Sequence, residues 1–233
     1  MFMDRTLFWD FDGTLVQANS KWSASMARAF ASVGHDVHQD EIRKYMRKSY
    51  SWDTPETHYP DAVGYAWWEA LFCRLLPLYY RYGLSGPEII RVNGALRDQI
   101  ISLTPYRLFD DTAKTLEQCS AIGYRNYMLS NNFPELADVA DNLGIGKFFS
   151  GYAVSACIGY EKPRREIFEY ALAIAENPHV CYMIGDNPEA DICGGNSMGL
   201  TTILVHNESQ HEADFLCKSL AEIPALLISR QPA

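Results

Sequence analysis

The ten residues from Leu7 to Val16, LFWDFDGTLV, constrain the fold of this chain more than any other segment. An apolar run typical of a buried strand ends at Asp10, and Asp12 follows two residues later. Side chains two residues apart on an extended chain lie on the same side, so both carboxylates should project beyond the strand end. Two carboxylates about 4 Å apart repel each other by roughly 4 kcal/mol at an effective dielectric near 20. Such a pair predicts a cation site or an acid–base site, the alternative being a solvated Asp-Gly turn.

The composition is that of an ordinary globular protein with an acidic balance. The chain has 233 residues, 48% of them hydrophobic, which allows one large domain or a domain with an insert. A net charge of −9 argues against a nucleic-acid partner but leaves room for a small phosphorylated substrate. No apolar run approaches the roughly 20 residues that span a bilayer, and the first ten residues lack a signal-peptide pattern. The six cysteines include no CxxC pair, which favours free thiols, so we expect a cytoplasmic protein without a membrane partner.

Short β-like runs alternate with helical patterns along most of the chain. The runs are Thr6–Asp10, Arg125–Ser130, Gly151–Val154, Val180–Ile184 and Thr201–Val205. Helical patterns follow capping residues at Asp110 or Asp111, run from Pro134 to Gly144, and cover Glu166–Ala175. Strands that alternate with helices predict an α/β fold in three layers, with a central parallel sheet covered on both faces.

Residues 18–103 interrupt this alternation and predict an all-helical insert. Amphipathic patterns fill most of this stretch, residues 51–60 form a polar loop, and Ser85 with Glu88 fits a capping box. We therefore expect a core domain from 1–17 and 104–233, and an inserted helical domain from 18–103. An aromatic stripe in the insert has two interpretations, a hydrophobic core, which helical spacing favours, or a substrate pocket. Its members are Trp67, Trp68 and Phe72.

Polar side chains stand at the ends of three predicted strands, where a parallel α/β sheet binds its ligands. Asp10 follows the first strand, residues 130–132 (Ser-Asn-Asn) end the second, and Asp186 follows the fourth, with Asp191 a further turn on. A separate segment carries Lys162, and a lysine is a mobile point charge suited to a phosphate. Each feature also has an ordinary explanation, since Lys162 could be a solvated surface lysine and Asp186 a helix N-cap. Three strand ends with complementary chemistry favour one shared site.

Four segments together resemble the motifs of the haloacid dehalogenase superfamily of phosphotransferases. They are, in order, DFDGT at 10–14, LSNN at 129–132, EKPRREIF at 161–168 and GDNPEAD at 185–191. Order and spacing agree with that family over essentially the whole chain outside the insert. Residues 213–227 are also similar to the family's closing strand and helix. The resemblance implies a Rossmann-like core, and the insert looks like the family's helical cap of the first type.

The resemblance implies a role for each matching residue. Asp10 would be the nucleophile that attacks phosphorus, and Asp12 would protonate the leaving alcohol and then activate water. Mg²⁺ would be bound by the Asp10 carboxylate, the Asp12 carbonyl oxygen and Asp186, while Asp191 would orient a metal-bound water. Further matching residues would bind the phosphate or shape the turn beside it, namely Gly13, Thr14, Ser130, the Asn131 amide and Lys162.

The resemblance implies a Mg²⁺-dependent phosphatase of small phosphorylated metabolites, present as a monomer or homodimer. Two alternatives stay open: a phosphomutase of the same superfamily, which keeps both aspartates, and a non-catalytic binding protein on this fold. The family's dehalogenases lack an acid at the position of Asp12. The chain departs from the family pattern at residues 156–157 and 164–165, which flank the site. A basic residue of the insert could read the leaving group, the candidates being Arg43, Arg47, His58 and Arg74.

Overall fold

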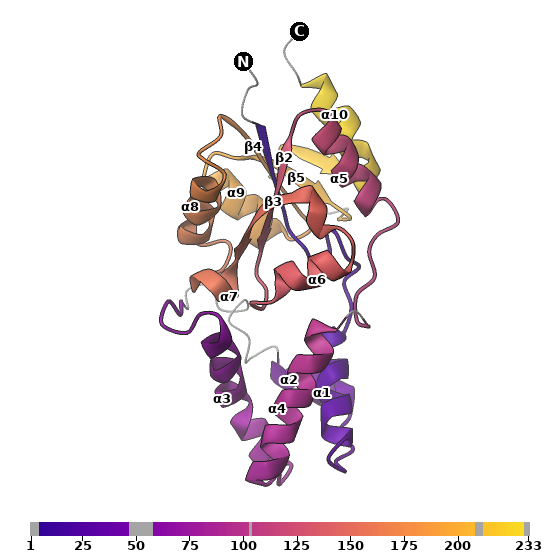
Figure 1. Ribbon diagram of the computed structural model, residues 1–233, viewed down its shortest axis with the longest axis vertical. Coiled ribbons are helices and arrows are strands. Elements are labelled where there is room, and N and C mark those ends of the chain that lie inside the picture. The colour runs from indigo at the N-terminus through magenta and orange to yellow at the C-terminus, as the bar shows by residue number, and fades with distance from the viewer. Residues whose placement is uncertain (1–4, 47–57, 103, 208–211, 231–233) are drawn as a thin grey trace.

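Six strands form one parallel sheet in the described part of the chain, in the order β3-β2-β1-β4-β5-β6. The computed structural model describes residues 5–46, 58–102, 104–207 and 212–230 (Figure 1). The strands are β1 (Arg5–Trp9), β2 (Arg125–Ser130), β3 (Phe149–Val154), β4 (Val180–Gly185), β5 (Thr201–Val205) and β6 (Phe215–Cys217). This is the strand order of a Rossmann-like fold, and it puts the reversal of winding between β1 and β4.

Helices cover both faces of the sheet, as the alternation of strands and helices predicts. These helices are α5 (Thr112–Ala121), α6 (Leu136–Asn142), α7 (Ser155–Ile158), α8 (Arg165–Ile174), α9 (Gly194–Ser197) and α10 (Ile223–Ser229). Short 3₁₀ turns are η2 (Gly146–Phe148) and η4 (Leu220–Glu222), and η3 (Pro188–Cys193) is a π-helical turn. Figure 1 shows α8 and α9 on one side of the sheet and α5 and α10 on the other.

Strand β1 lies in the middle of the sheet and is buried on both faces. Leu7 and Trp9 point into the hydrophobic cluster shared with α5 and α10, while Phe8 joins the cluster under α8. All three side chains are fully buried. The alternation of a strand therefore fixes which face each residue packs on, and it delivers Asp10 to the carboxyl edge of the sheet.

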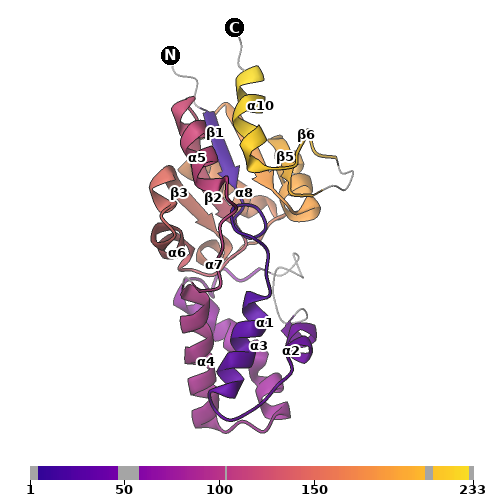
Figure 2. The same cartoon turned by 90° about the vertical axis from the view of Figure 1, so that its right-hand side faces the viewer.

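Four helices among the described residues of 18–103 form a separate helical unit beyond the carboxyl edge of the sheet (Figures 1 and 2). They are α1 (Lys21–Ala31), α2 (Gln39–Met46), α3 (Tyr65–Arg81) and α4 (Gly86–Ile101). The start of β1 and the end of α10 lie at the opposite end of the molecule. The aromatic stripe packs in the core of this unit, since Trp67 and Trp68 are buried and Phe72 packs against Trp68. None of the three lines the large cavity described below.

Direct contacts hold the helical unit against the sheet domain. Glu135, in the loop before α6, accepts hydrogen bonds from the Trp68 indole and the Arg97 guanidinium, at 2.9 and 2.5 Å. On the other side, the Tyr59 hydroxyl donates to the buried Glu161 carboxylate at 2.7 Å. The amide of Gly64 also donates to a carbonyl oxygen of the sheet domain. These contacts describe a closed arrangement in which side chains of both parts can share one site.

The predicted elements agree with the structure except at some ends and caps. The α/β fold and the Ser85–Glu88 capping box are confirmed, and most of the described residues of 18–103 are helical. The helix expected from Pro134 begins at Leu136, because two turn residues precede it. The Asp111 side chain accepts from the Ala221 amide instead of capping α5. The closing strand and helix, suggested by resemblance alone, are β6 and α10.

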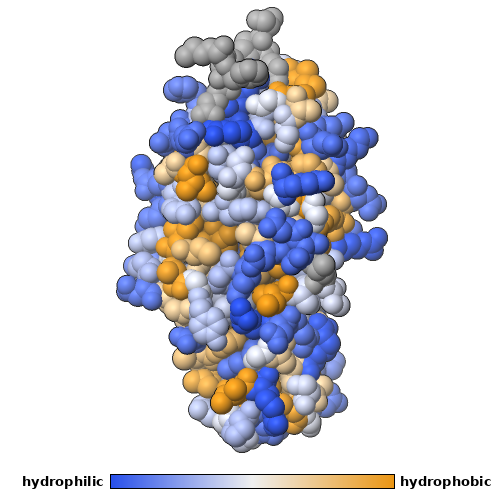
Figure 3. Space-filling model, in the orientation of Figure 1, coloured by the Kyte–Doolittle hydropathy of each residue, from blue (hydrophilic) through white to orange (hydrophobic). Residues whose placement is uncertain are grey.

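The remaining expectations concern cysteines and surfaces. All six cysteines are free thiols, as the absence of a paired pattern predicts. No helix among the described residues is long and apolar enough to cross a membrane. The face in Figure 3 mixes hydrophilic and hydrophobic residues over both the sheet domain and the helical unit.

Candidate active site

A cavity of about 310 Å³ opens where the carboxyl edge of the sheet faces the helical unit. It lies over the ends of β1, β2 and β4, so it spans the point where the winding of the sheet reverses, the usual ligand site of such folds. Residues from both parts of the protein line it: Asp10, Asp12, Ala18, Asn19, Lys21, Trp22, Ser130, Asn131, Asn132, Lys162, Asp186, Asn187, Ala190 and Asp191.

Three carboxylates meet at the floor of this cavity. Asp10, Asp186 and Asp191 each have a carboxylate oxygen within 4.8 Å of the other two. Glycines make the approach possible, because a Cβ at Gly13 would lie 2.3 Å from the Asp186 carboxylate and one at Gly185 would lie 2.0 Å from Asp191. Gly13 also has a φ of 84°, which other residues rarely adopt. The DFDGT turn therefore closes only with glycine at its fourth position.

Lys162 supplies positive charge between two of these acids. Its ammonium lies 2.8 Å from Asp10 and 2.5 Å from Asp191, and the side chain is 2% exposed. Burial alone would lower the pKa of Lys162, but the carboxylates of Asp10 and Asp191 outweigh burial and raise the pKa above its ordinary value. The lysine is therefore a buried cation, and the alternative of a solvated surface lysine is wrong.

The carboxylates carry more negative charge than the lysines balance. Burial, and then the charges of Asp10 and Asp191, raise the pKa of Asp186 to about 7. Burial also raises the pKa of Asp191, although Lys162 opposes the rise. Four carboxylates and two ammonium groups line the cavity, which leaves a formal charge of −2 when all are ionised. A cluster of carboxylate oxygens with an unbalanced negative charge fits a divalent cation such as Mg²⁺.

Asp191 is oriented by its neighbours toward a supporting role. One carboxylate oxygen accepts from Lys162, and the other accepts from the Asn187 amide at 3.0 Å. The Asn187 side chain in turn caps the π-helical turn η3, and Asp191 is one of the buried residues of this turn. Asp186 is held differently, with Thr14 donating to its carboxylate at 3.2 Å. Thr14 thus acts on a candidate metal ligand and does not line the cavity.

Asp12 has a different set of partners from Asp10. The Lys21 ammonium lies 2.5 and 2.7 Å from its two carboxylate oxygens, and the Asn132 amide donates to one of them at 2.8 Å. The side chain of Asp12 is 38% exposed, whereas Asp10 is buried. The two aspartates of the motif therefore occupy distinct electrostatic environments.

The polar loop after β2 fixes the position of Lys162 as well as facing the cavity. The Asn131 side chain donates to the Lys162 carbonyl oxygen at 2.9 Å and accepts from the Lys162 amide at 2.7 Å. The buried Ser130 hydroxyl lines the cavity and accepts a hydrogen bond from the Asn132 side chain at 3.4 Å. The Ser155 hydroxyl accepts a hydrogen bond from the Asn132 backbone amide at 3.0 Å, which fixes the loop to the start of α7.

The structure brings together the predicted aspartates, Lys162, Ser130 and Asn131, with Gly13 and Thr14 beneath Asp186. Sequence reasoning missed Lys21, Trp22 and the contact of Asn132 with Asp12. Nothing around Lys21 distinguishes it from a solvated lysine at a helix start. Three of the basic residues considered as contacts of the leaving group do not line the cavity, namely Arg43, His58 and Arg74. Arg47 lies outside the described residues.

Comparisons with known proteins identify the family of this chain. A sequence profile described as haloacid dehalogenase-like hydrolase matches residues 5–220, and the chain belongs to that family. Glyceraldehyde 3-phosphate phosphatase from Methanothermobacter thermautotrophicus is 29% identical over 148 residues, which cover 62% of this chain and 65% of that enzyme. The match thus spans slightly less than two thirds of that relative.

Solved structures share the fold over nearly the whole chain. YfnB from Bacillus subtilis, bound to magnesium, has a TM-score of 0.70 at 20% identity, covering 96% of this chain and 98% of that one. A 2-haloacid dehalogenase from Pseudomonas syringae has a TM-score of 0.72 at 19% identity, covering 97% and 99%. At such identities the likeness establishes the fold, and the choice among activities falls to the residues of the site.

Proposed function

We propose that this haloacid dehalogenase-like hydrolase is a Mg²⁺-dependent phosphatase of small phosphorylated metabolites that works through an aspartyl-phosphate on Asp10. The observation that carries the proposal is the separation of Asp10 from Asp12. Asp10 is buried against Lys162, whereas Asp12 is more exposed and held by Lys21 and Asn132. A nucleophile and a proton-transfer group have those requirements.

The reaction divides into two displacements at phosphorus. A carboxylate oxygen of Asp10 attacks, the bond from phosphorus to the leaving oxygen breaks, and Asp12 gives that oxygen a proton. Water then attacks the same phosphorus, Asp12 takes the proton, and the bond to Asp10 breaks to release inorganic phosphate. Because the nucleophile and the substrate are both anions, Lys162 has to neutralise the phosphate oxygens as they approach. Ser130 and the Asn131 amide would bind the same oxygens.

The donor set at the cavity floor supports Mg²⁺ as the cofactor. The Asp10 and Asp186 carboxylates and the Asp12 carbonyl oxygen would hold the ion, and Asp191 would act through a bound water. When bound, Mg²⁺ would reduce the repulsion between Asp10 and the phosphate. The raised pKa of Asp186 supports this assignment, since that carboxyl lacks a full counter-charge among the described residues. The magnesium in YfnB is consistent with it.

The helical unit would act as a cap that closes over the substrate and excludes water. A cavity of about 310 Å³ favours a compact substrate, in line with the glyceraldehyde 3-phosphate of the methanogen relative. Asp12 disfavours a dehalogenase, whose reaction leaves no alkoxide to protonate. A phosphomutase would use the same residues and differ in where the phosphoryl group goes next.

Phosphate release from a panel of small phosphorylated metabolites and 4-nitrophenyl phosphate tests the proposal. The parent is assayed with Mg²⁺ and with EDTA, beside Asp10→Asn and the matched variant Asp138→Asn on the exposed surface of α6. We expect release that requires both Mg²⁺ and Asp10 and that Asp138→Asn leaves intact. Conversion of a sugar phosphate to its isomer at trace bisphosphate would favour a mutase, and appreciable turnover by Asp10→Asn would refute the nucleophile assignment.

A further inference from the structure

Lys21 reaches from the helical unit to the acid–base residue of the proposed reaction. It is the first residue of α1, yet its side chain is only 4% exposed because it points into the cavity. Its ammonium contacts both carboxylate oxygens of Asp12, and it pairs with no other carboxylate among the residues that the structure describes. A lysine at the start of a helix is ordinarily solvated, so this burial requires an explanation.

Aromatic rings surround the rest of the ammonium group. Its nitrogen lies 4.6 Å from the ring centre of Tyr106 and 5.9 Å from those of Phe11 and Phe133. Phe11 belongs to the DFDGT turn, Tyr106 to the second linker between the two parts of the protein, from α4 to α5, and Phe133 to the loop after β2. They attract the cation and offer it no hydrogen-bond acceptor on their faces. The enclosure therefore directs the donors of Lys21 toward Asp12.

The backbone of Lys21 is fixed to both linkers between the helical unit and the sheet domain. Its amide donates to the Asn19 side chain at 2.8 Å, and the Asn19 amide group donates to the Pro105 carbonyl oxygen. Residue 19 belongs to the first linker and residue 105 to the second. A change in the angle between the two parts would thus move the Lys21 ammonium relative to Asp12, which stays with β1.

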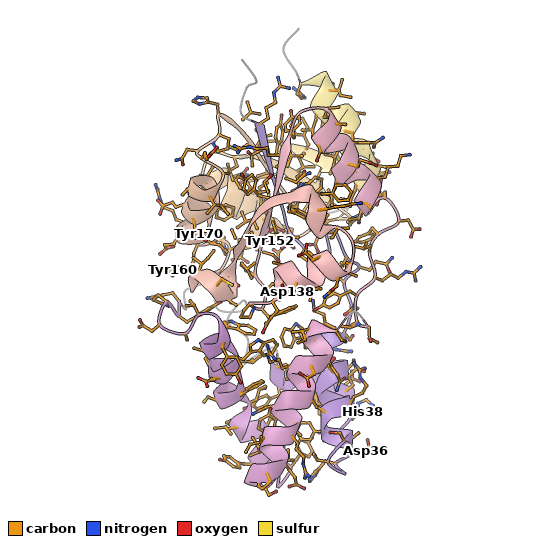
Figure 4. The ribbon with its side chains drawn as sticks, viewed as in Figure 1. Asp36, His38, Asp138, Tyr152, Tyr160 and Tyr170 are labelled. Carbon is orange, nitrogen blue, oxygen red and sulfur yellow. The ribbon has the colours of Figure 1, made fainter. Side chains whose placement is uncertain are left out.

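Other features of the helical unit do not reach this site. Figure 4 shows Asp36 and His38 toward its far end, away from the sheet. The Arg97–Glu135 contact joins the two parts but does not line the cavity. Among the described residues of the helical unit, Lys21 is therefore the charged side chain that contacts a residue of the proposed reaction.

We propose that Lys21 is a positioning residue that, with Asn132, holds the Asp12 carboxylate in its working orientation only when the helical unit is closed. The inference rests on the proposed phosphatase function. Lys21 contacts both oxygens and Asn132 contacts one, so together they fix the rotation of a side chain that is otherwise 38% exposed. Proton transfer then becomes efficient only after the substrate is enclosed. A displacement of about 1 Å in such a group lowers rates about 100-fold.

The test separates proton transfer from substrate binding and from folding. Lys21→Met and Lys21→Gln are compared with the parent and with Lys44→Met, an exposed lysine of α2. Each is assayed with 4-nitrophenyl phosphate, whose leaving group needs no proton. Rapid-quench kinetics give the first release of 4-nitrophenolate and the later steady-state turnover. Circular dichroism identifies any variant that fails to fold, and Lys21→Gln, which keeps a donor and most of the length, then carries the test.

We expect the first release to stay within about 3-fold of the parent while steady-state kcat falls about 10- to 100-fold, because activation of water requires an oriented Asp12. KM should fall by a similar factor, so that kcat/KM, which reports the first displacement, stays within about 3-fold of the parent. In a double-mutant cycle, Asp12→Asn with Lys21→Met should be no slower than Asp12→Asn alone, since Lys21 acts through Asp12.

Three results would overturn the inference: a large rise in KM at unchanged kcat, which would make Lys21 a substrate contact; additive losses in the cycle; or parent kinetics in both folded Lys21 variants. The failure of the proposed function itself looks different, because the parent would then release no phosphate with Mg²⁺.

Discussion

Replacing Asp186 by asparagine should stabilise the metal-free protein at pH 8 and abolish its stabilisation by Mg²⁺. The carboxyl lies among like charges, and burial followed by the charges of Asp10 and Asp191 raises its pKa from 3.8 to about 7. An asparagine would keep an oxygen for the hydroxyl of Thr14 and remove the charge. The variant would therefore lose repulsion and a metal ligand together.

The size of the effect follows from the difference between the two pKa values. Between about pH 4 and pH 7 the folded protein holds this proton and the unfolded chain does not, so the free energy of unfolding falls as the pH rises. A pKa difference of about 3 sets an upper limit of about 4 kcal/mol at pH 8. Because neighbouring acids share the repulsion, we expect Asp186→Asn to gain about 2–3 kcal/mol there. At pH 5 only about one of those three pH units has contributed, so the gain should be about a third of its size at pH 8.

Thermal denaturation of EDTA-dialysed protein at pH 5 and pH 8 measures this difference. A gain of 2–3 kcal/mol corresponds to roughly 4–12 °C for a chain of this size. Asp138→Asn, an exposed residue on α6 (Figure 4), is the matched control and should show no such contrast between the two pH values. With Mg²⁺ present, the melting temperature should rise in the parent and in the control but not in Asp186→Asn. The reasoning would be refuted by a variant no more stable than the parent at pH 8, or equally stabilised at both pH values.

Three further substitutions test other parts of the site. Asp12→Asn should lower turnover about 10²- to 10⁴-fold and accumulate the aspartyl-phosphate, which acid quench of labelled substrate detects; turnover at the parent rate would contradict its acid–base role. Gly13→Ala would put a Cβ 2.3 Å from Asp186, and calorimetry should show Mg²⁺ affinity weakened about 10- to 100-fold. Lys162→Met leaves Asp10 and Asp191 without their shared cation, so urea denaturation at pH 8 should show a loss of about 3–5 kcal/mol, and a loss below about 1 kcal/mol would count against the buried pair.

Local patterns in the sequence were sufficient to predict the elements of the core. The run Leu7–Trp9 is apolar at every position because β1 is buried on both faces, and this makes the strand recognisable without its partners. The Ser85–Glu88 box identifies the start of α4 because a cap involves residues three apart in the chain. Both features depend on neighbours in sequence, and both were predicted.

Contacts between distant segments could not be predicted in the same way. Lys21 differs from a solvated lysine only through Asp12 and through rings contributed by residues 11, 106 and 133. Helical spacing favours a core for the Trp68 stripe but leaves a pocket open, and the packing of α3 settles it as core. These side chains are buried by contacts between segments far apart in the sequence, and no local pattern encodes such contacts.

The sequence by itself determined the strand ends, the acids and bases placed on them and the position of the insert, because periodicity and turn chemistry act over a few residues. Only the tertiary structure decided that β1 and β4 are neighbours, so that Asp10 meets Asp186 and Asp191 where the winding of the sheet reverses. It also decided which lysine neutralises which aspartate. Charge interactions depend on distance in space and on burial, and a folded chain sets both through contacts between residues more than a hundred positions apart.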